Sequence, residues 1–222
     1  MSGKPKIAVV LSGCGVYDGA EIHEAVLTLL AIDRHGAAYQ CFAPDIPQTH
    51  VINHLTGKES GEKRNVLVEA ARIARGNIRP LREYRVADFD GIVFPGGFGA
   101  AKNLSSFAFK GPACTVDPDV ERAITDTRAA GKPIGALCIS PAVMAKVLGA
   151  VDLTIGNDAG TAAALESLGA RHKTTTHGEI VVDTAAKLVT TPCYMLDATV
   201  SQIATGADAV IAGMLGLMAA SK

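Results

Sequence analysis

Short apolar segments alternate with longer amphipathic segments along the whole chain. Residues 7–11 form a continuous apolar run, typical of a strand buried on both faces of a parallel sheet. Residues 20–35 follow with apolar positions at helical spacing. The same reasoning predicts strands at 38–43, 89–94, 133–137 and 153–155, a hairpin from 179–183 and 187–191, and helices at 65–75, 118–130, 140–148, 160–168 and 196–219. This alternation favours an α/β fold with a mainly parallel, doubly wound sheet.

Charge and composition exclude several classes of partner. The 222 residues carry 21 Lys plus Arg and 22 Asp plus Glu, a formal net charge of −1, so neither nucleic acid nor an anionic membrane is an expected partner. No apolar run approaches the roughly 20 residues that cross a bilayer, and no signal-peptide pattern follows residues 7–11. Without a linker or internal repeat, we expect one domain over residues 5–220.

The cysteines indicate a reducing compartment. There are five, widely spaced and without a C-x-x-C pair, which argues against disulfides and a zinc site. We therefore expect a cytoplasmic protein with no metal site. His50 and His54 have ligand spacing, but a clear third ligand is missing.

Cys138 occupies a distinctive position, directly after the predicted strand 133–137 and before a predicted helix. A nucleophile elbow needs small residues two places to either side of the nucleophile, and Ala136 and Ser140 satisfy this. Pro141 suits a first helical turn. The helix N-terminus is expected to lower the pKa of the thiol below about 8.5, which makes Cys138 a candidate nucleophile rather than a structural cysteine.

Two other predicted strand ends carry candidate partners for Cys138. Gly96 and Gly97 follow strand 89–94, and their N–H groups are candidate oxyanion donors, although a tight turn alone also requires glycine. Glu21 and Glu24 lie at i and i+3 in the first turn of helix 20–35, where acidic residues also serve as partners of the helix dipole. Because ligands bind at the carboxyl ends of parallel strands, these turns are expected to converge.

Several motifs together resemble the ElbB family (enhancing lycopene biosynthesis, or sigma cross-reacting, proteins) of the class I glutamine amidotransferase-like superfamily. Besides the Cys138 elbow, they are Val10-Leu-Ser-Gly-Cys-Gly-Val-Tyr-Asp-Gly-Ala-Glu-Ile-His-Glu-Ala-Val26, Asn53-His-Leu-Thr-Gly57 and Pro95-Gly-Gly-Phe-Gly-Ala-Ala-Lys-Asn-Leu104. The resemblance covers almost the whole chain. It implies a flavodoxin-like three-layer sandwich, a homodimer and a cofactor-free glyoxalase activity that converts glyoxal to glycolate. Protein deglycase activity would give the same readout in an assay of this reaction.

Position by position, the resemblance gives Cys138 the place of the nucleophile, Glu24 that of the neighbouring carboxylate and Gly97 that of the oxyanion glycine. Glu21 is the less favoured carboxylate. Gly96, Ile139, His54 and Asn103 complete the candidate substrate-binding group, and Cys14 is placed near its rim. Amidotransferases and the related peptidases have His after the nucleophile, whereas this chain has Ile139. Neither glutaminase nor peptidase activity is therefore expected.

Two functional hypotheses follow. In the first, Cys138 adds to the aldehyde of glyoxal or methylglyoxal, or acts on a glycated protein, and Glu24, with a raised pKa, moves the proton. His54, in the long loop 45–63, is a weaker candidate for assisting this transfer. In the second, Cys138 is the oxidation sensor of a non-catalytic stress or metabolic regulator.

Overall fold

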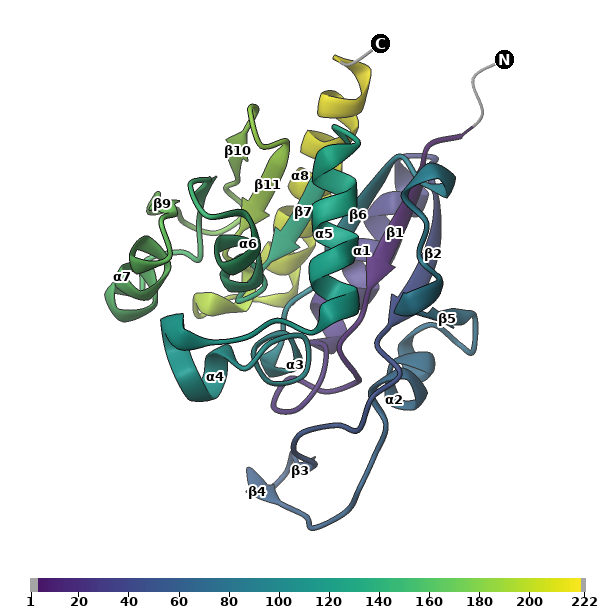
Figure 1. Ribbon diagram of the computed structural model, residues 1–222, viewed down its shortest axis with the longest axis vertical. Coiled ribbons are helices and arrows are strands. Elements are labelled where there is room, and N and C mark those ends of the chain that lie inside the picture. Colours follow the sequence, from purple (N-terminus) through teal and green to yellow (C-terminus); the bar gives the residue numbers. More distant parts are fainter. Residues whose placement is uncertain (1–3, 221–222) are drawn as a thin grey trace.

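A seven-stranded sheet forms the centre of the computed structural model, which describes residues 4–220 (Figure 1). Its strands, in spatial order, are β10 (Val181–Asp183), β11 (Leu188–Thr191), β7 (Ile134–Leu137), β6 (Gly91–Phe94), β1 (Lys6–Val10), β2 (Ala38–Ala43) and β5 (Ile78–Pro80). Neighbouring strands are parallel except for the β10–β11 hairpin. The fold is therefore the mainly parallel α/β fold that the alternation predicts.

Helices cover both faces of this sheet, which gives three layers. The helices are α1 (Ile22–Arg34), α2 (Val66–Ile73), α3 (Phe98–Lys102), α4 (Phe107–Lys110), α5 (Pro118–Ala129), α6 (Pro141–Leu148), α7 (Ala159–Ser167) and α8 (Val200–Ala219). Alternate residues of β1 point to opposite faces: Ala8 and Val10 pack with α5 and α6, whereas Ile7 and Val9 pack with α1, α2 and α8. This is why a central strand reads as a continuous apolar run.

The C-terminal helix α8 belongs to one of these layers. It is long and apolar enough to cross a membrane by length and composition alone, a criterion that core helices of soluble proteins also meet. Ile203, Ala207, Val210 and Met214 are fully buried on its inner side, in the same core cluster as Val189 of β11. Its apolar composition is thus used in packing against the sheet.

Local sequence signals fix most helix ends. Asp117 accepts hydrogen bonds from two N–H groups at the start of α5, and Pro118 occupies its first turn. Asn65 and Asp158 cap α2 and α7 in the same way. Gly36 follows α1 with φ 71°, a conformation that glycine adopts without a steric penalty.

Some sequence predictions need correction. The strand expected at 153–155 is β8 (Asp152–Leu153), which pairs with β9 (Arg171–His172) in a separate small sheet instead of extending the central one. The segment expected as loop 45–63 contains a short hairpin, β3 (Ile52–Asn53) and β4 (Lys58–Glu59), which extends away from the sheet (Figure 1). Two-residue strands bury too little apolar surface to leave a clear periodic pattern.

Candidate active site

Cys138 lies in a sharp turn at the carboxyl end of β7. Its φ is 60°, a strained value for a residue with a side chain, and its exposed fraction is only 6%. The Cys138 N–H donates to the carbonyl of Thr191 (2.9 Å), and the Ser140 hydroxyl donates to the carbonyl of Pro95 (2.9 Å). These bonds attach the turn to both neighbouring strand ends, as expected of a nucleophile elbow.

Glu24 is fully buried on the first turn of α1 and directs its carboxyl group at this turn. Oε2 accepts a hydrogen bond from the N–H of Gly96 (2.9 Å), and Oε1 accepts one from the N–H of Tyr194 (3.1 Å). The carboxyl group and the Cys138 side chain both adjoin Gly96, and each affects the pKa of the other. Glu24 thus joins three strand ends, and the predicted convergence of the turns is confirmed.

Burial controls the protonation of both groups. It raises the pKa of Glu24 to about 8, while the N–H groups of Tyr194 and Gly96 and the neighbouring Cys138 side chain oppose the shift. The raised pKa expected for this carboxyl is therefore confirmed. Burial, followed by the charge of Glu24, also raises the pKa of the Cys138 thiol well above its usual range, although the N–H groups of Gly97 and Ile139 act in the other direction.

The lowered thiol pKa expected from the sequence is consequently wrong. Cys138 precedes Ser140, the N-cap of α6, and so lies just outside the first turn of that helix. Desolvation and a neighbouring carboxyl outweigh the two N–H groups at the sulfur. Of the two acids the Glu24 carboxyl ionises first, because its pKa of about 8 lies below the strongly raised pKa of the thiol.

The two glycines have different roles. The N–H of Gly96 is already bonded to Glu24, which removes it from the expected pair of oxyanion donors. A side chain here is excluded, because a Cβ would lie 2.4 Å from the Cys138 Cβ and 2.6 Å from Glu24 Oε2. Gly97 adopts φ 94°, and its N–H, with that of Ile139, faces the Cys138 sulfur. These two N–H groups are therefore the candidate oxyanion donors.

Glu21 is a structural residue. It precedes α1 as its N-cap, and its Oε2 accepts a hydrogen bond from the N–H of Glu24 (2.7 Å). The expectation that both carboxylates share one helical face is therefore wrong, since Glu21 lies outside the helix. Its backbone N–H donates to the carbonyl of Gly96 (2.9 Å), which fixes the glycine turn against α1.

His54 and Asn103 stabilise the loops that surround the site instead of lining it. The His54 ring bonds the carbonyl of Ile52 through Nδ1 (3.0 Å) and accepts from the N–H of Tyr17 through Nε2 (3.2 Å). The Asn103 amide donates to the carbonyls of Ser12 and Asp18, both at 2.9 Å. Neither residue borders the cavity at Cys138, and Cys14 does not border it either.

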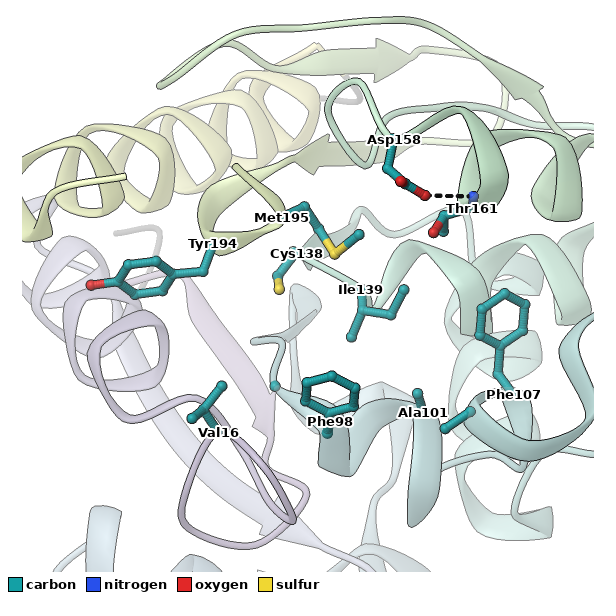
Figure 2. A pocket seen from close by; sticks show the side chains of 12 residues that line it. Val16, Phe98, Ala101, Phe107, Cys138, Ile139, Asp158, Thr161, Tyr194 and Met195 are labelled. Atoms are coloured by element: carbon teal, nitrogen blue, oxygen red, sulfur yellow. Dashed lines mark hydrogen bonds between the residues drawn. The ribbon is translucent and has the colours of Figure 1, made fainter. Parts of the chain in front are cut away.

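A cavity of about 490 Å³ opens in front of the Cys138 sulfur (Figure 2). Its lining is mostly apolar: Val16, Gly97, Phe98, Ala101, Phe107, Ala108, Cys138, Ile139, Asp158, Thr161, Tyr194 and Met195. Figure 2 shows the Tyr194 ring directed away from the other side chains, and its hydroxyl bonds His23 Nδ1 (2.8 Å). Ile139 is the only predicted substrate residue, apart from Cys138 and Gly97, that borders this space.

Sequence reasoning missed the far wall of this cavity. Tyr194 and Met195 lie in a short 3-10 helix, Cys193–Met195, immediately after β11. Since β11 is the parallel neighbour of β7, the rule that ligands bind at carboxyl strand ends was sufficient to find them. Phe98 and Phe107 come from the short helices α3 and α4, which no sequence pattern indicated.

The two histidines with ligand spacing face different partners. His50 packs edge-to-face on Phe109 (5.3 Å between ring centroids), whereas His54 packs on Tyr17 (4.9 Å). Within residues 4–220, no three His, Cys, Asp or Glu side chains are grouped so that they could hold a metal ion.

Comparisons with known proteins show relatives over nearly the whole chain. No family model matches. The chain is 49% identical to human "glutamine amidotransferase-like class 1 domain-containing protein 3, mitochondrial", covering 96% of this chain and 83% of that protein. It is 47% identical to rat "ES1 protein homolog, mitochondrial", covering 96% and 84%. The cytoplasmic localisation expected from the sequence is contradicted by these names, which are those of mitochondrial proteins.

Solved structures agree on the fold. An Ehrlichia chaffeensis isoprenoid biosynthesis protein with an amidotransferase-like domain superposes with a TM-score of 0.91 and 38% identity, covering 96% of this chain and 99% of that one. Glyoxalase III from Candida albicans superposes with a TM-score of 0.62 at 14% identity, covering 94% and 97%. The second likeness supports the flavodoxin-like fold alone.

Proposed function

The chain belongs to the family of class 1 glutamine amidotransferase-like proteins that includes the ES1 proteins, and we propose that it is a cofactor-independent glyoxalase. The observation that carries this proposal is the Cys138 thiol, next to a buried Glu24 and facing an apolar cavity. The substrate is a small dicarbonyl such as glyoxal, or the same group attached to a glycated protein. The ElbB-type motifs support this choice, since the resemblance that they carry implies glyoxalase activity.

The reaction is an internal redox change that needs no external oxidant. The sulfur adds to one aldehyde carbon, and its proton passes through Glu24 to the new hydroxyl group, giving a hemithioacetal. Glu24 then removes the hydrogen on that carbon as a proton and delivers it to the neighbouring carbon through an enediol. The first carbon is oxidised to a thioester and the second is reduced to an alcohol. Water hydrolyses the thioester, which releases glycolate and restores the thiol.

The electrostatics of the site suit both proton transfers. A carboxyl with a pKa of about 8 is close to the operating pH, where a group accepts and returns protons efficiently. The N–H groups of Gly97 and Ile139, which face the sulfur, are positioned to stabilise negative charge as it develops there. Because Tyr194 and Gly96 hold the two carboxyl oxygens, the carboxyl group remains oriented throughout.

The same features argue against the alternative, an oxidation sensor. Sensor cysteines are typically exposed and have a low pKa, since the thiolate reacts with peroxide. Cys138 is 6% exposed, and burial raises its pKa. A thiol that keeps its proton beside a carboxyl able to accept that proton fits base-assisted catalysis better than sensing.

We also propose a mitochondrial location, which the names of the relatives support, and a homodimer, as the family resemblance implies.

The proposed dimer contact is an apolar stripe on α1. Ile22, Val26 and Leu30 lie along the outer side of α1 at intervals of four residues and are 44, 46 and 37% exposed. Outward helix faces are usually polar, so this stripe is the proposed contact. Sedimentation of the Val26→Glu variant as a monomer is the expected result, and an unchanged dimer would exclude this stripe.

The test of the proposed activity is glycolate formation from glyoxal by metal-free protein. The Cys138→Ser variant is expected to fall to the level of the buffer. The matched control is Cys14→Ser, which changes a more accessible thiol that does not border the cavity and is expected to retain activity. Equal turnover by wild type and Cys138→Ser would refute the proposal. Absence of turnover by the wild type, with Cys138 readily oxidised by peroxide, would favour the sensor.

A further inference from the structure

The cavity at Cys138 is far larger than glyoxal needs. Its volume of about 490 Å³ lies in the range of pockets that enclose drug-sized ligands, roughly 300–1,000 Å³. A two-carbon dialdehyde bound at the sulfur would leave most of the apolar wall in contact with water. Such a substrate gains nothing from Phe98, Phe107, Ile139 or Met195.

The lining of the cavity differs between its two ends: one end is reactive and the rest is mostly apolar. The Cys138 sulfur and the N–H groups of Gly97 and Ile139 form its reactive end, and Phe98, Phe107 and Met195 surround the remaining space (Figure 2). No lysine, arginine or histidine lines the cavity among the residues that the structure describes, and Asp158 is its charged member. Oδ1 of Asp158 accepts a hydrogen bond from the N–H of Thr161 (2.7 Å) at the start of α7.

These charges exclude one substrate class and favour another. A ligand with its own carboxylate, such as glutamine or an oxo acid, would meet Asp158 and find no cation. An uncharged apolar group, by contrast, would replace water on the aromatic and aliphatic wall, which is favourable. We propose, as a refinement that rests on the proposed function, that the preferred substrates are neutral α-oxoaldehydes with a bulky aryl or branched alkyl substituent.

The chemistry at the sulfur is unchanged for these substrates. The thiol adds to the aldehyde carbon, the hydrogen on that carbon moves as a proton to the adjacent ketone carbon, and water releases a 2-hydroxy acid. The aldehyde carbon is oxidised and the ketone carbon is reduced, so the balance again needs only water. The substituent on the ketone carbon occupies the apolar part of the cavity.

Phenylglyoxal and glyoxal are the probes. Two tryptophan variants separate the effect of the cavity on the rates from the intrinsic reactivity of the two substrates. Ala108 borders the cavity from an exposed position of α4, so Ala108→Trp narrows the space with little risk to folding. Ala163→Trp, at an exposed position of α7 that does not line the cavity, is the control. The wild type is expected to favour phenylglyoxal in kcat/KM by at least about tenfold. Ala108→Trp should remove most of this preference and Ala163→Trp none of it.

A binding measurement separates this inference from the proposed activity. Acetophenone has no aldehyde, but it is expected to slow alkylation of Cys138 by iodoacetamide in the wild type and not in Ala108→Trp. Protection without turnover of either oxoaldehyde would refute the glyoxalase and support the cavity assignment. Turnover of glyoxal with no phenylglyoxal preference and no protection would overturn the inference alone. Faster turnover of 4-carboxyphenylglyoxal than of phenylglyoxal would overturn it as well.

Discussion

Two pairs of polar residues were expected at the active site, near the carboxyl end of the sheet. The pairs differ in burial and in the partners of their hydrogen bonds. In the first, Cys138 and Glu24 are buried together, and burial raises the pKa of both. In the second, His54 and Asn103 bond backbone groups of the surrounding loops. The first pair is thus suited to exchange a proton, whereas the second pair stabilises the conformation of the loops.

The sharpest test of this difference is Glu24→Gln. The variant removes the proton acceptor, so glyoxal turnover is expected to fall by about 10²–10⁴-fold. Iodoacetamide should still alkylate Cys138, because the sulfur remains at the cavity. His54→Gln is the matched loop control. Full turnover by Glu24→Gln would remove the proposed role of Glu24.

The pH dependence of the wild type sharpens the comparison next. Below about pH 8 the pair retains both protons, so kcat/KM for glyoxal should rise about tenfold per pH unit from pH 6 and level off near pH 8. Stopped assays of glycolate across this range measure it. A profile that is flat between pH 6 and 8 would contradict the raised pKa of Glu24.

Protein stability should show the same proton. The folded state keeps the Glu24 proton up to about pH 8, whereas the unfolded chain releases it near 4.5. Because the folded state binds more protons between these values, this carboxyl makes the free energy of unfolding fall as pH rises, by up to about 1.4 kcal/mol per pH unit. Urea unfolding from pH 5 to 8 should show a steeper fall for wild type than for Glu24→Gln. Parallel curves would exclude the shift.

The second pair, His54 and Asn103, should affect stability more than chemistry. Asn103→Ala leaves the buried Ser12 and Asp18 carbonyls and the N–H of Thr49 without their partner, which should cost about 2–3 kcal/mol of unfolding free energy. The kcat for glyoxal should change little. Chemical denaturation and steady-state kinetics on the same preparation check both, and a large loss of kcat without destabilisation would return Asn103 to the active site.

The smallest effect is expected for His54→Ala. Its ring is partly exposed, bonds two backbone groups and lies 3.9 Å from Asp18 Oδ1, so its loss should cost about 1 kcal/mol or less. Turnover should stay close to that of the wild type. An unchanged melting temperature with a strongly altered pH profile would show that His54 takes part in proton transfer.

Features of this protein that depend on residues close together in the sequence were predictable from the sequence. Apolar runs and caps such as Asp117 are local, and they indicated the central strands and most helices. The elbow was predictable because Ala136, Cys138 and Ser140 are close in sequence. Strand-end convergence, a general property of parallel sheets, brought Glu21 and Glu24 to the turn of Cys138, and the family resemblance favoured Glu24.

The remainder depends on contacts between distant segments. The thiol pKa depends on how deeply Cys138 is buried and on the charge of Glu24 beside it, and no local sequence pattern shows either. The use of the Gly96 N–H by Glu24 joins residues 72 positions apart. The partners of His54 were not predictable, because a histidine in a motif has the same sequence signature whether its ring faces a substrate or a backbone carbonyl.

The most direct test of the central claim is the pH dependence of Cys138 alkylation, followed by mass spectrometry of the Cys138 peptide in the Cys14→Ser background. The raised pKa values of the pair predict slow alkylation at pH 6 and a rate that rises through pH 8 and beyond. A rate already at its plateau below pH 7 would show that Cys138 is a thiolate at that pH and would contradict the raised pKa of the thiol.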